Sequence, residues 1–499
     1  MRISKFCLMS LLSLLLLSCF SDKSTDAIRP LSEITIVSGI ESVYNIEKNE
    51  TIKIDPVVTQ VFNENELQYT WEINLVEETT DTVFVFTGDK LGKYNCRLIV
   101  ENKDGKTFFP FTIFVNSPYE EGITILSQDE NGKSMISFMQ KPNDGNKGKF
   151  MDYDCFEKNN PGESFAAGAI DIVQSSGTLM VLCQGGGEAD DVPAIYYLNE
   201  KTFVVETELR VPEYEDFKPT MFAIPEFGYS GTSYPILCEN GKVYDFSTTE
   251  TVVSKPQRLQ YTYEQKCIVT TDKGFDPILL WDKDHGGLSM IYYGLGPYFC
   301  STEYLLEWTD AEFATKNYFA NRQFVTMTKI HMTTEQKIAN ANHEEFLILT
   351  RSKLTPAVFS EVLNTDLWKY NGVENELITS CSQNEIIALP INVATPCIAN
   401  KTFFTLLFAS GNKVRSWKYD SPLKELPNAK TLATVGSDDA VITGFEMSDD
   451  NKKTYVAFYE PKQEGLNGSM WVIDTDKGTV LEQYDNISYK PVKMIYKKK

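Results

Sequence analysis

Three short acidic clusters are the residues of this 499-residue chain whose spacing could bind a cation. They are Glu188–Asp191, which follows three glycines, Asp282–His285, which precedes two glycines, and Asp474–Gly478. Carboxylates at alternating positions before a glycine are oxygen ligands that Ca²⁺ uses in loops. None of the three has the twelve-residue loop with its closing glutamate, and hairpin turns select aspartate and glycine without any metal. We therefore expect turns here and predict no metal site.

Motifs for catalysis are missing from the sequence. The run Gly228–Gly231 differs by one position from the Gly-x-Ser-x-Gly of serine hydrolases, and Gly294-Leu295-Gly296 lacks the third glycine of a dinucleotide fingerprint. The three histidines, His285, His331 and His343, do not have zinc-ligand spacing. Paired carboxylates can hydrolyse glycosides, but among 69 acidic residues suitable pairs are unavoidable. We predict no catalytic residue and no cofactor.

Aromatic residues of the second part of the chain are a better indication of binding. Successive side chains of a strand point to opposite faces, so one member of each adjacent pair is expected in the core. The other member could line a surface for sugars or peptide side chains. For each single residue, core or ordinary surface is the favoured interpretation, so the ligand-binding residues stay unknown. The residues are Tyr196-Tyr197, Tyr292-Tyr293, Tyr298-Phe299, Trp308, Tyr318-Phe319 and Trp417-Lys418-Tyr419.

The first residues have the pattern of a targeting segment. Arg2 and Lys5 precede an apolar run over residues 6–17, which is too short to cross a membrane as a helix of about 20 residues. The run ends in Leu16-Leu17-Ser18-Cys19, which is similar to a bacterial lipoprotein box. That resemblance implies a signal peptide over 1–18, acylation of the Cys19 thiol and a tether over 19–30. The alternative is an ordinary cleavage site at which a cysteine occurs by chance.

The charge of the chain excludes one class of partner. The balance is 47 − 69 = −22, which argues against nucleic-acid binding because phosphates are neutralised by Lys and Arg. Removing residues 1–18 takes away Arg2 and Lys5 and gives 45 − 69 = −24, which repels anionic lipid headgroups. The pair Ser21-Asp22, just after Cys19, resembles the surface-export signal of Bacteroidetes lipoproteins. We expect a protein anchored by its lipid and exposed on the outer-membrane surface.

Eight cysteines remain besides Cys7 of the leader and Cys19. No two of them form a Cys-x-x-Cys pair, so zinc and redox motifs are not predicted. Several lie in apolar runs, where free cysteine packs as a small hydrophobe, and we favour reduced core cysteines. Disulfides are the alternative that an extracytoplasmic location allows. The eight are Cys96, Cys155, Cys183, Cys238, Cys267, Cys300, Cys381 and Cys397.

Residues 31–116 have the pattern of a small β-sandwich. Short runs rich in β-branched and aromatic residues recur about every ten residues and are separated by turn residues. Tyr69 and Trp71 alternate with polar residues, which predicts Trp71 in the core. Tyr94, Cys96 and Leu98 alternate inward, and a tyrosine two residues before an inward cysteine resembles a tyrosine corner.

This region resembles the PKD-like domain of Bacteroides lipoproteins. The resemblance rests on YTWEI (69–73), on residues 92–115 and on the junction SPYEEGITILSQDENGKSMISFM (117–139). Members of that family combine a lipoprotein box, this domain and a larger C-terminal part. They resemble accessory surface lipoproteins of Sus-type importers, in which a lipoprotein lid sits on a TonB-dependent barrel. The resemblance therefore implies such a barrel and lid as partners and oligopeptides or glycans as cargo.

The body over residues 121–499 has the pattern of a β-propeller. Strand–turn–strand units recur every 40–60 residues, several with Asn-Gly turns as in residues 123–139 and 233–248. Seven or eight blades would take about 47–54 residues each. We expect VKMIY (492–496) to pair with ITILS (123–127) and close the ring. A parallel β-helix is the alternative, which the hairpins disfavour. The fold class is thus all-β, a PKD/Ig-like sandwich followed by a propeller.

Three segments interrupt this pattern. A capping box at Thr309–Glu312 predicts a helix to about Arg322, and a second helix is predicted within Thr333–Asn342. Proline after Thr355 predicts a third helix over AVFSEVL (357–363). Helices inserted between blades often shape a binding surface.

Together these features favour a non-catalytic surface lipoprotein that serves a Sus-type nutrient importer through protein or ligand binding. A propeller-fold glycan hydrolase or lyase on the cell surface is the alternative. A third possibility is a scaffold that takes no small ligand.

Overall fold

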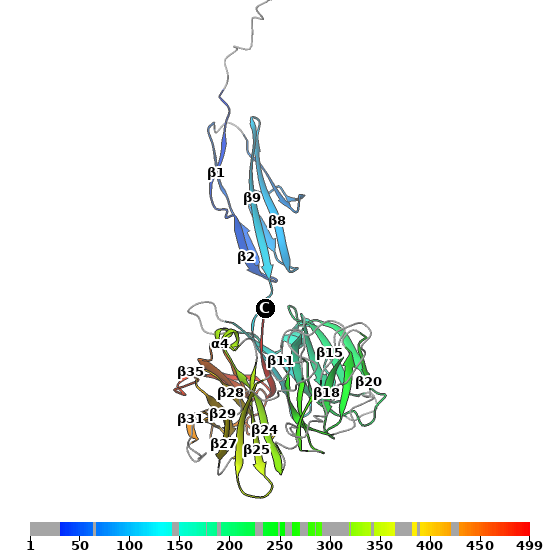
Figure 1. The fold of residues 1–499 in the computed structure, drawn as a ribbon. Coiled ribbons are helices and arrows are strands. Elements are labelled where there is room, and N and C mark those ends of the chain that lie inside the picture. The colour runs from blue at the N-terminus through cyan, green and yellow to red at the C-terminus, as the bar shows by residue number, and fades with distance from the viewer. Residues whose placement is uncertain are drawn as a thin grey trace, which may run out of the picture. The chain divides into compact units, whose positions relative to one another are not determined.

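The computed structural model describes most of the chain as two compact all-β units (Figure 1). The first unit ends at Ser117 and the second begins at Pro118. Only two short helices are described, α2 (Cys155–Asn159) and α4 (Thr334–Ala339). The structure describes residues 30–499 except 63–65, 142–148, 176, 187–190, 225–232, 248–249, 255–261, 270–277, 285, 292–318, 320, 341–343, 365–381, 387–389 and 421–428.

The first unit is a β-sandwich. A five-stranded sheet in the order β2-β9-β8-β5-β6 packs against two strand pairs, β1-β4 and β3-β7, and all pairings except β2–β9 are antiparallel. The strands are β1 (Ile34–Ser38), β2 (Val43–Glu47), β3 (Thr51–Ile54), β4 (Val57–Gln60), β5 (Gln68–Ile73), β6 (Val76–Thr79), β7 (Phe84–Thr87), β8 (Gly92–Asn102) and β9 (Gly105–Asn116).

The sandwich core is built around Trp71, as the alternation in β5 predicts. Its side chain is fully buried and stacks on Phe84 with ring centroids 4.9 Å apart. Its indole N–H donates to the carbonyl of Asp81 at 2.9 Å, so the one polar atom of the ring is satisfied. Cys96 and Leu98 of β8 lie in the same core, which confirms the inward alternation of that strand.

The tyrosine corner at Tyr94 is also present. The Tyr94 hydroxyl donates to the carbonyl of Lys90 at 2.8 Å, four residues upstream, and its ring meets Phe86 edge-on. This contact holds the chain where it enters β8.

Removing the Tyr94 hydroxyl is expected to weaken the sandwich modestly. Tyr94→Phe keeps the contact with Phe86 but leaves the Lys90 carbonyl without its donor, which should cost about 0.5–1.5 kcal/mol of unfolding free energy. Urea unfolding of the full chain measures it. Tyr153→Phe, at a side chain of the second unit that is 53% exposed, is the control and should change little. Equal losses in the two variants would contradict the corner.

The second unit is a β-propeller, in which the described strands form seven blades. Blade 1 consists of β36 (Lys490–Lys497), β10 (Gly122–Gln128), β11 (Ser134–Gln140) and β12 (Lys149–Asp152), and blade 2 of β13 (Ala169–Ser175), β14 (Thr178–Cys183), β15 (Ala194–Asn199) and β16 (Val205–Arg210). Blade 3 consists of β17 (Pro219–Phe222), β18 (Ser233–Cys238), β19 (Val243–Ser247) and β20 (Val252–Ser254). Blade 4 consists of β21 (Tyr263–Val269), β22 (Ile278–Asp282) and β23 (Gly287–Ile291).

Blades 5–7 complete the ring. They are β24 (Arg322–His331), β25 (Glu345–Ser352), β26 (Val358–Asn364) and β27 (Ser382–Ile386); β28 (Cys397–Asn400), β29 (Thr405–Ser410), β30 (Lys413–Lys418) and β31 (Lys430–Thr434); and β32 (Val441–Met447), β33 (Lys453–Tyr459), β34 (Gly468–Asp474) and β35 (Val480–Ser488). Blades 5 and 6 share two parallel pairs, Ile330–Ala399 and His331–Asn400.

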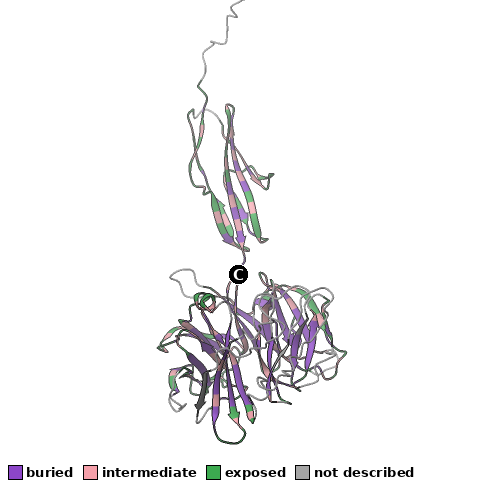
Figure 2. Ribbon diagram, viewed as in Figure 1, coloured by how far each residue is buried: buried purple, intermediate pink, exposed green. Residues whose placement is uncertain are grey.

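The ring is closed by the pairing expected from the sequence. In β36, Tyr496, Met494 and Lys493 pair with Ile123, Ile125 and Leu126 of β10, so the last strand completes the blade that the first strands begin. β36 also contacts the inner strands β13 and β32 of the neighbouring blades. Apolar side chains fill the spaces between successive blades, and strands such as β10, β14 and β33 are mostly buried (Figure 2).

The helix predictions have mixed outcomes. The helix predicted within Thr333–Asn342 is present as α4, with Thr333 as N-cap in a capping box with Gln336. The helix predicted over residues 357–363 is wrong, because this segment is strand β26 and pairs with β25 and β27. The backbone of this segment is paired on both sides, and its β-branched and aromatic side chains are buried or half-buried on both faces of the sheet. These contacts outweigh the preference for a helix start that the proline indicated. The helix predicted from Thr309 lies outside the described residues except near Arg322, which begins β24.

Candidate functional site

The centre of the ring holds a charge pair between neighbouring blades. Asp171 of β13 is buried, and its Oδ1 lies 3.3 Å from Nζ of Lys493 on β36. Its Oδ1 also accepts the N–H of Ile172 at 3.0 Å, and Oδ2 accepts the N–H of Phe222 from β17 at 2.8 Å. One carboxylate therefore joins three inner strands. Asp171 raises the pKa of Lys493 above its ordinary value, outweighing the opposite effect of burial.

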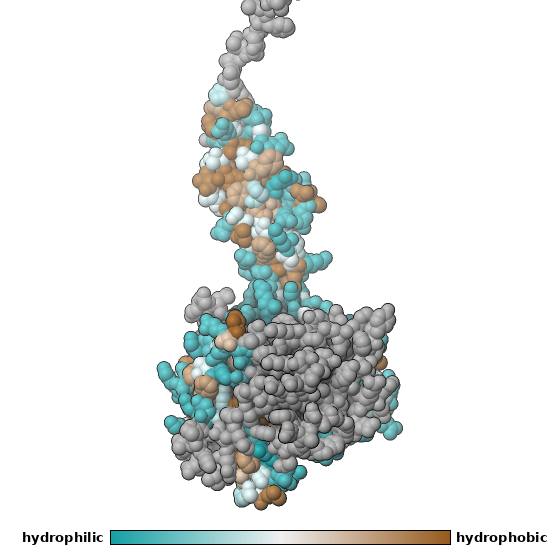
Figure 3. Space-filling model, viewed as in Figure 1, coloured by the Kyte–Doolittle hydropathy of each residue, from teal (hydrophilic) through white to brown (hydrophobic). Residues whose placement is uncertain are grey.

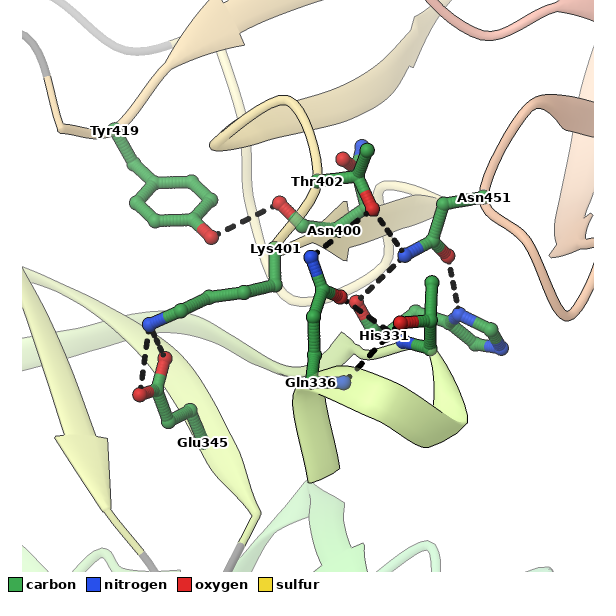
Figure 4. Close-up of polar contacts among 9 residues, drawn as sticks. His331, Gln336, Glu345, Asn400, Lys401, Thr402, Tyr419 and Asn451 are labelled. Carbon is green, nitrogen blue, oxygen red and sulfur yellow. Dashed lines mark hydrogen bonds and ion pairs between the residues drawn. The ribbon is translucent and has the colours of Figure 1, made fainter. Parts of the chain in front are cut away.

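A second polar network links blades 5, 6 and 7 at one end of their inner strands (Figure 4). His331 ends β24, Thr402 follows β28 and Asn451 lies in the turn after β32. The Asn451 amide donates to the carbonyl of His331 at 3.3 Å and to Oγ1 of Thr402 at 2.9 Å. Its Oδ1 is then left to accept the Nδ1–H of His331, which fixes the tautomer of the neutral ring.

Two ion pairs and a tyrosine extend this network. Nζ of Lys401 contacts both oxygens of Glu345 at 2.8 and 2.6 Å, and Lys329 contacts the buried Glu344 at 2.7 Å. The Tyr419 hydroxyl donates to the carbonyl of Asn400 at 2.9 Å. Helix α4 has no buried residue of its own and is held by its polar side chains: Gln336 donates to Oγ1 of Thr402 at 3.3 Å, and Lys337 lies 3.5 Å from Glu344. The arrangement is one that holds loops in place rather than one that presents an open acid or base.

His331 is expected to make the stability of the propeller depend on pH. Burial lowers its pKa below the ordinary value of 6.5, so the folded state resists a proton that the unfolded state accepts. The contribution of His331 to the free energy of unfolding is fully present above about pH 6.5. It falls as pH decreases from 6.5 toward the lowered pKa. Thermal unfolding of the chain and of His331→Gln at pH 5–8 measures this. The difference between them should shrink with falling pH, and a pH-independent difference would contradict it.

Acidic residues of the three clusters accept backbone N–H groups in the part of the chain that the structure describes, and those bonded to Asp474 belong to the predicted turn. Asp474 Oδ1 accepts the N–H of Asp476 and of Lys477, and Gly478 has a positive φ of 71°. Asp284 accepts the N–H of Thr262, and Asp191 accepts the N–H of Gly186 and of Ala167. No group of three potential metal ligands occurs among the described residues. Glu188, Asp190, His285 and His343 lie outside them.

The described aromatic candidates mostly pack in the core. Tyr196, Phe319, Trp417 and Tyr419 are buried, whereas Tyr197 is half-buried. Residues 292–318, which contain the other candidates, are not described. All six described cysteines are free, and four of them are buried. Burial raises the pKa of Cys96 to about 11 and of Cys238 to about 12, so both are thiols at neutral pH.

Glu361 is a buried acid that the sequence did not single out. It is fully buried, and burial raises its pKa to about 7 although Arg322 pairs with it. The Arg322 guanidinium lies 4.2 Å from the ring centroid of Phe359. A raised carboxyl pKa is a property of catalytic acids, but here the group is enclosed in a structural ion pair.

The sequence also did not single out Asp171 and Lys493. The signals that could have identified them were an acidic residue in the apolar run of β13 and a lysine in the apolar run of β36.

Comparisons with known proteins do not show the family of the chain. No family model matches it, and no curated protein matches it. A solved Quinonprotein alcohol dehydrogenase-like protein from Bacteroides thetaiotaomicron VPI-5482 is similar with 13% identity and a TM-score of 0.44, over 93% of this chain and 99% of that one. A DUF4784 family protein from Bacteroides caccae ATCC 43185 is similar with 10% identity and a TM-score of 0.27, over 93% and 98%.

A third similar structure is the β-propeller domain of Cps50 from Myceliophteria thermophila. It has 8% identity and a TM-score of 0.36, over 66% of this chain and 90% of that one. The strand pairings above, and not these distant likenesses, define the propeller. No described helix is long and apolar enough to cross a membrane.

Proposed function

We propose that this protein is a non-catalytic, lipid-anchored protein of the outer-membrane surface that serves a Sus-type, TonB-dependent importer of oligopeptides or glycans. The observation that carries the proposal is the run Leu16-Leu17-Ser18-Cys19, which precedes two all-β units. In this role Cys19 bears the lipid, and the propeller contacts the barrel, its lipoprotein lid or the nutrient.

The geometry favours binding over catalysis in the described part of the chain. The carboxylates of Asp191, Asp284 and Asp474 accept hydrogen bonds from backbone N–H groups. His331 is held by Asn451 at a junction of blades, and Glu361 is enclosed with Arg322. Side chains that are engaged in such hydrogen bonds and ion pairs stabilise the fold, and a binding protein requires a rigid fold of this kind.

Purification from the native outer membrane tests the proposal. The full chain, tagged at its C-terminus and solubilised in mild detergent, is expected to bring along a TonB-dependent barrel and its lid. The Cys19→Ala variant is the control for contacts made only after lysis. A chain that emerges alone would overturn the importer role.

The same preparation separates the other roles. Incubation with a panel of oligopeptides and polysaccharides should give binding without turnover. Turnover of a polysaccharide would replace the proposal by the surface hydrolase or lyase. A barrel complex that binds none of the panel would favour a scaffold.

A further inference from the structure

The last strand of the propeller touches both the ring and the linker that leads into it. β36 lies between the inner strands β13 and β32 and is bonded to β10, the strand that directly follows the linker residues 118–121. A strand in this position can leave the ring only by breaking its ladder with β10. Two sets of side-chain contacts hold it there, one at the ring centre and one at its end.

The set at the centre consists of Lys493 and its partner Asp171. Lys493 pairs with the carboxylate at 3.3 Å, and the same carboxylate accepts the N–H of Phe222 from the third blade. The Lys493 side chain keeps 40% of its exposure, whereas that of Asp171 keeps 3%. The carboxylate is therefore the buried partner that cannot find water if Lys493 is displaced. Displacing β36 would leave a buried charge without its cation, which is strongly unfavourable.

The set at the end joins β36 to the linker. The Lys497 ammonium is buried and donates to the carbonyl of Glu120 at 2.7 Å, and Lys499 pairs with the Glu120 carboxylate at 2.7 Å. The Tyr496 hydroxyl donates to Glu121 at 2.7 Å. The linker thus receives contacts from three residues at the end of the last strand.

A reciprocal pair extends the strand onto the second blade. Gln174 of β13 donates through Nε2 to the carbonyl of Lys498 at 2.9 Å and accepts the Lys498 N–H at 2.8 Å. Strand β13 of the second blade therefore contacts the C-terminal segment at two places, through Asp171 and through Gln174.

We propose that β36 closes the ring and fixes the linker at the same time, and that the Asp171–Lys493 ion pair holds β36 in place. We call β36 the latch and this ion pair its lock. When the lock is intact, Lys497 and Lys499 are placed on the linker carbonyl and carboxylate of Glu120. When the lock fails, β36 and the linker loosen together. This inference is independent of the importer, since it concerns only contacts within the second unit.

Hydrogen exchange of the full chain with Asp171→Asn tests the latch. The amide keeps the shape of the side chain but removes the carboxylate charge that pairs with Lys493, and it offers one acceptor oxygen in place of two. Exchange in peptides covering 119–127 and 490–499 is expected to rise at least tenfold together. Peptides of β14 and of β8 should stay within about twofold, because local opening precedes global unfolding.

Two further variants keep the test decisive. Lys493→Met removes the charge from the other side and should loosen the same two segments. Asp439→Asn removes the partner of Lys462 in an exposed pair and should change neither segment. A uniform rise across the propeller would overturn the latch. So would a rise in 490–499 without 119–127, or no rise at all.

Discussion

Cys19→Ala is expected to move the protein from the membrane fraction to the soluble fraction. A lipid chain contributes about 0.8 kcal/mol for each buried CH₂ group, and a single chain binds a membrane only weakly whereas several hold durably. With residues 1–18 removed, the proposed mature chain would have a net charge of −24, which would oppose contact with anionic headgroups. Fractionation of cells followed by immunoblotting measures the shift.

The N-terminal apolar run contains a control residue for this experiment. Cys7 lies inside the apolar run, so Cys7→Ala should leave the protein in the membrane fraction and processing unchanged. A Cys19→Ala protein that stays with membranes after a high-salt wash would contradict the lipid anchor.

Trp71→Ala is expected to destabilise the sandwich by about 3–5 kcal/mol. The variant removes the largest side chain of that core, including its stacking on Phe84, and leaves a cavity that the two sheets can fill only in part. The Asp81 carbonyl also loses its donor. Because the sandwich and the propeller are separate compact units, we expect the loss in one unfolding transition and not in the other. Calorimetry of the full chain resolves the two.

An exposed aromatic of the same unit provides the comparison. Phe108 is 51% exposed on β9, so Phe108→Ala should cost less than about 1 kcal/mol. Similar losses at Trp71 and Phe108 would contradict the assignment of Trp71 as the centre of the core.

Local sequence patterns were sufficient to predict the elements that depend on residues close to one another in the sequence. Alternation in β5 and β8 placed Trp71, Cys96 and Leu98 inside, because a strand can bury only one face in a sandwich. Asn-Gly turns predicted hairpins, and the glycines Gly132 and Gly241 have the positive φ that such turns require. The helix α4 followed from its capping box, which is a contact between near neighbours in sequence.

Local patterns failed where distant strands decide the outcome. Residues 357–363 follow a proline and predict a helix, but β25 and β27 supply ladders on both sides and make the segment a strand. Glu361 within it gives no sign in sequence of its pairing with Arg322. The junction of His331, Thr402 and Asn451 combines residues up to 120 positions apart, so no spacing could predict it.

The sequence by itself determined the class of fold, the pairing of the last strand with β10 and the prediction of a lipid at Cys19. These depend on alternation, turn residues and a short targeting pattern, all of which are written in neighbouring residues. Only the tertiary structure decided that seven blades form the described ring, that Asp171 serves three of them, and that Asp191 and Asp284 bond backbone N–H groups of distant segments. Those facts depend on which strands lie side by side, because a charge buried between blades is stable only when its partners arrive from other parts of the chain.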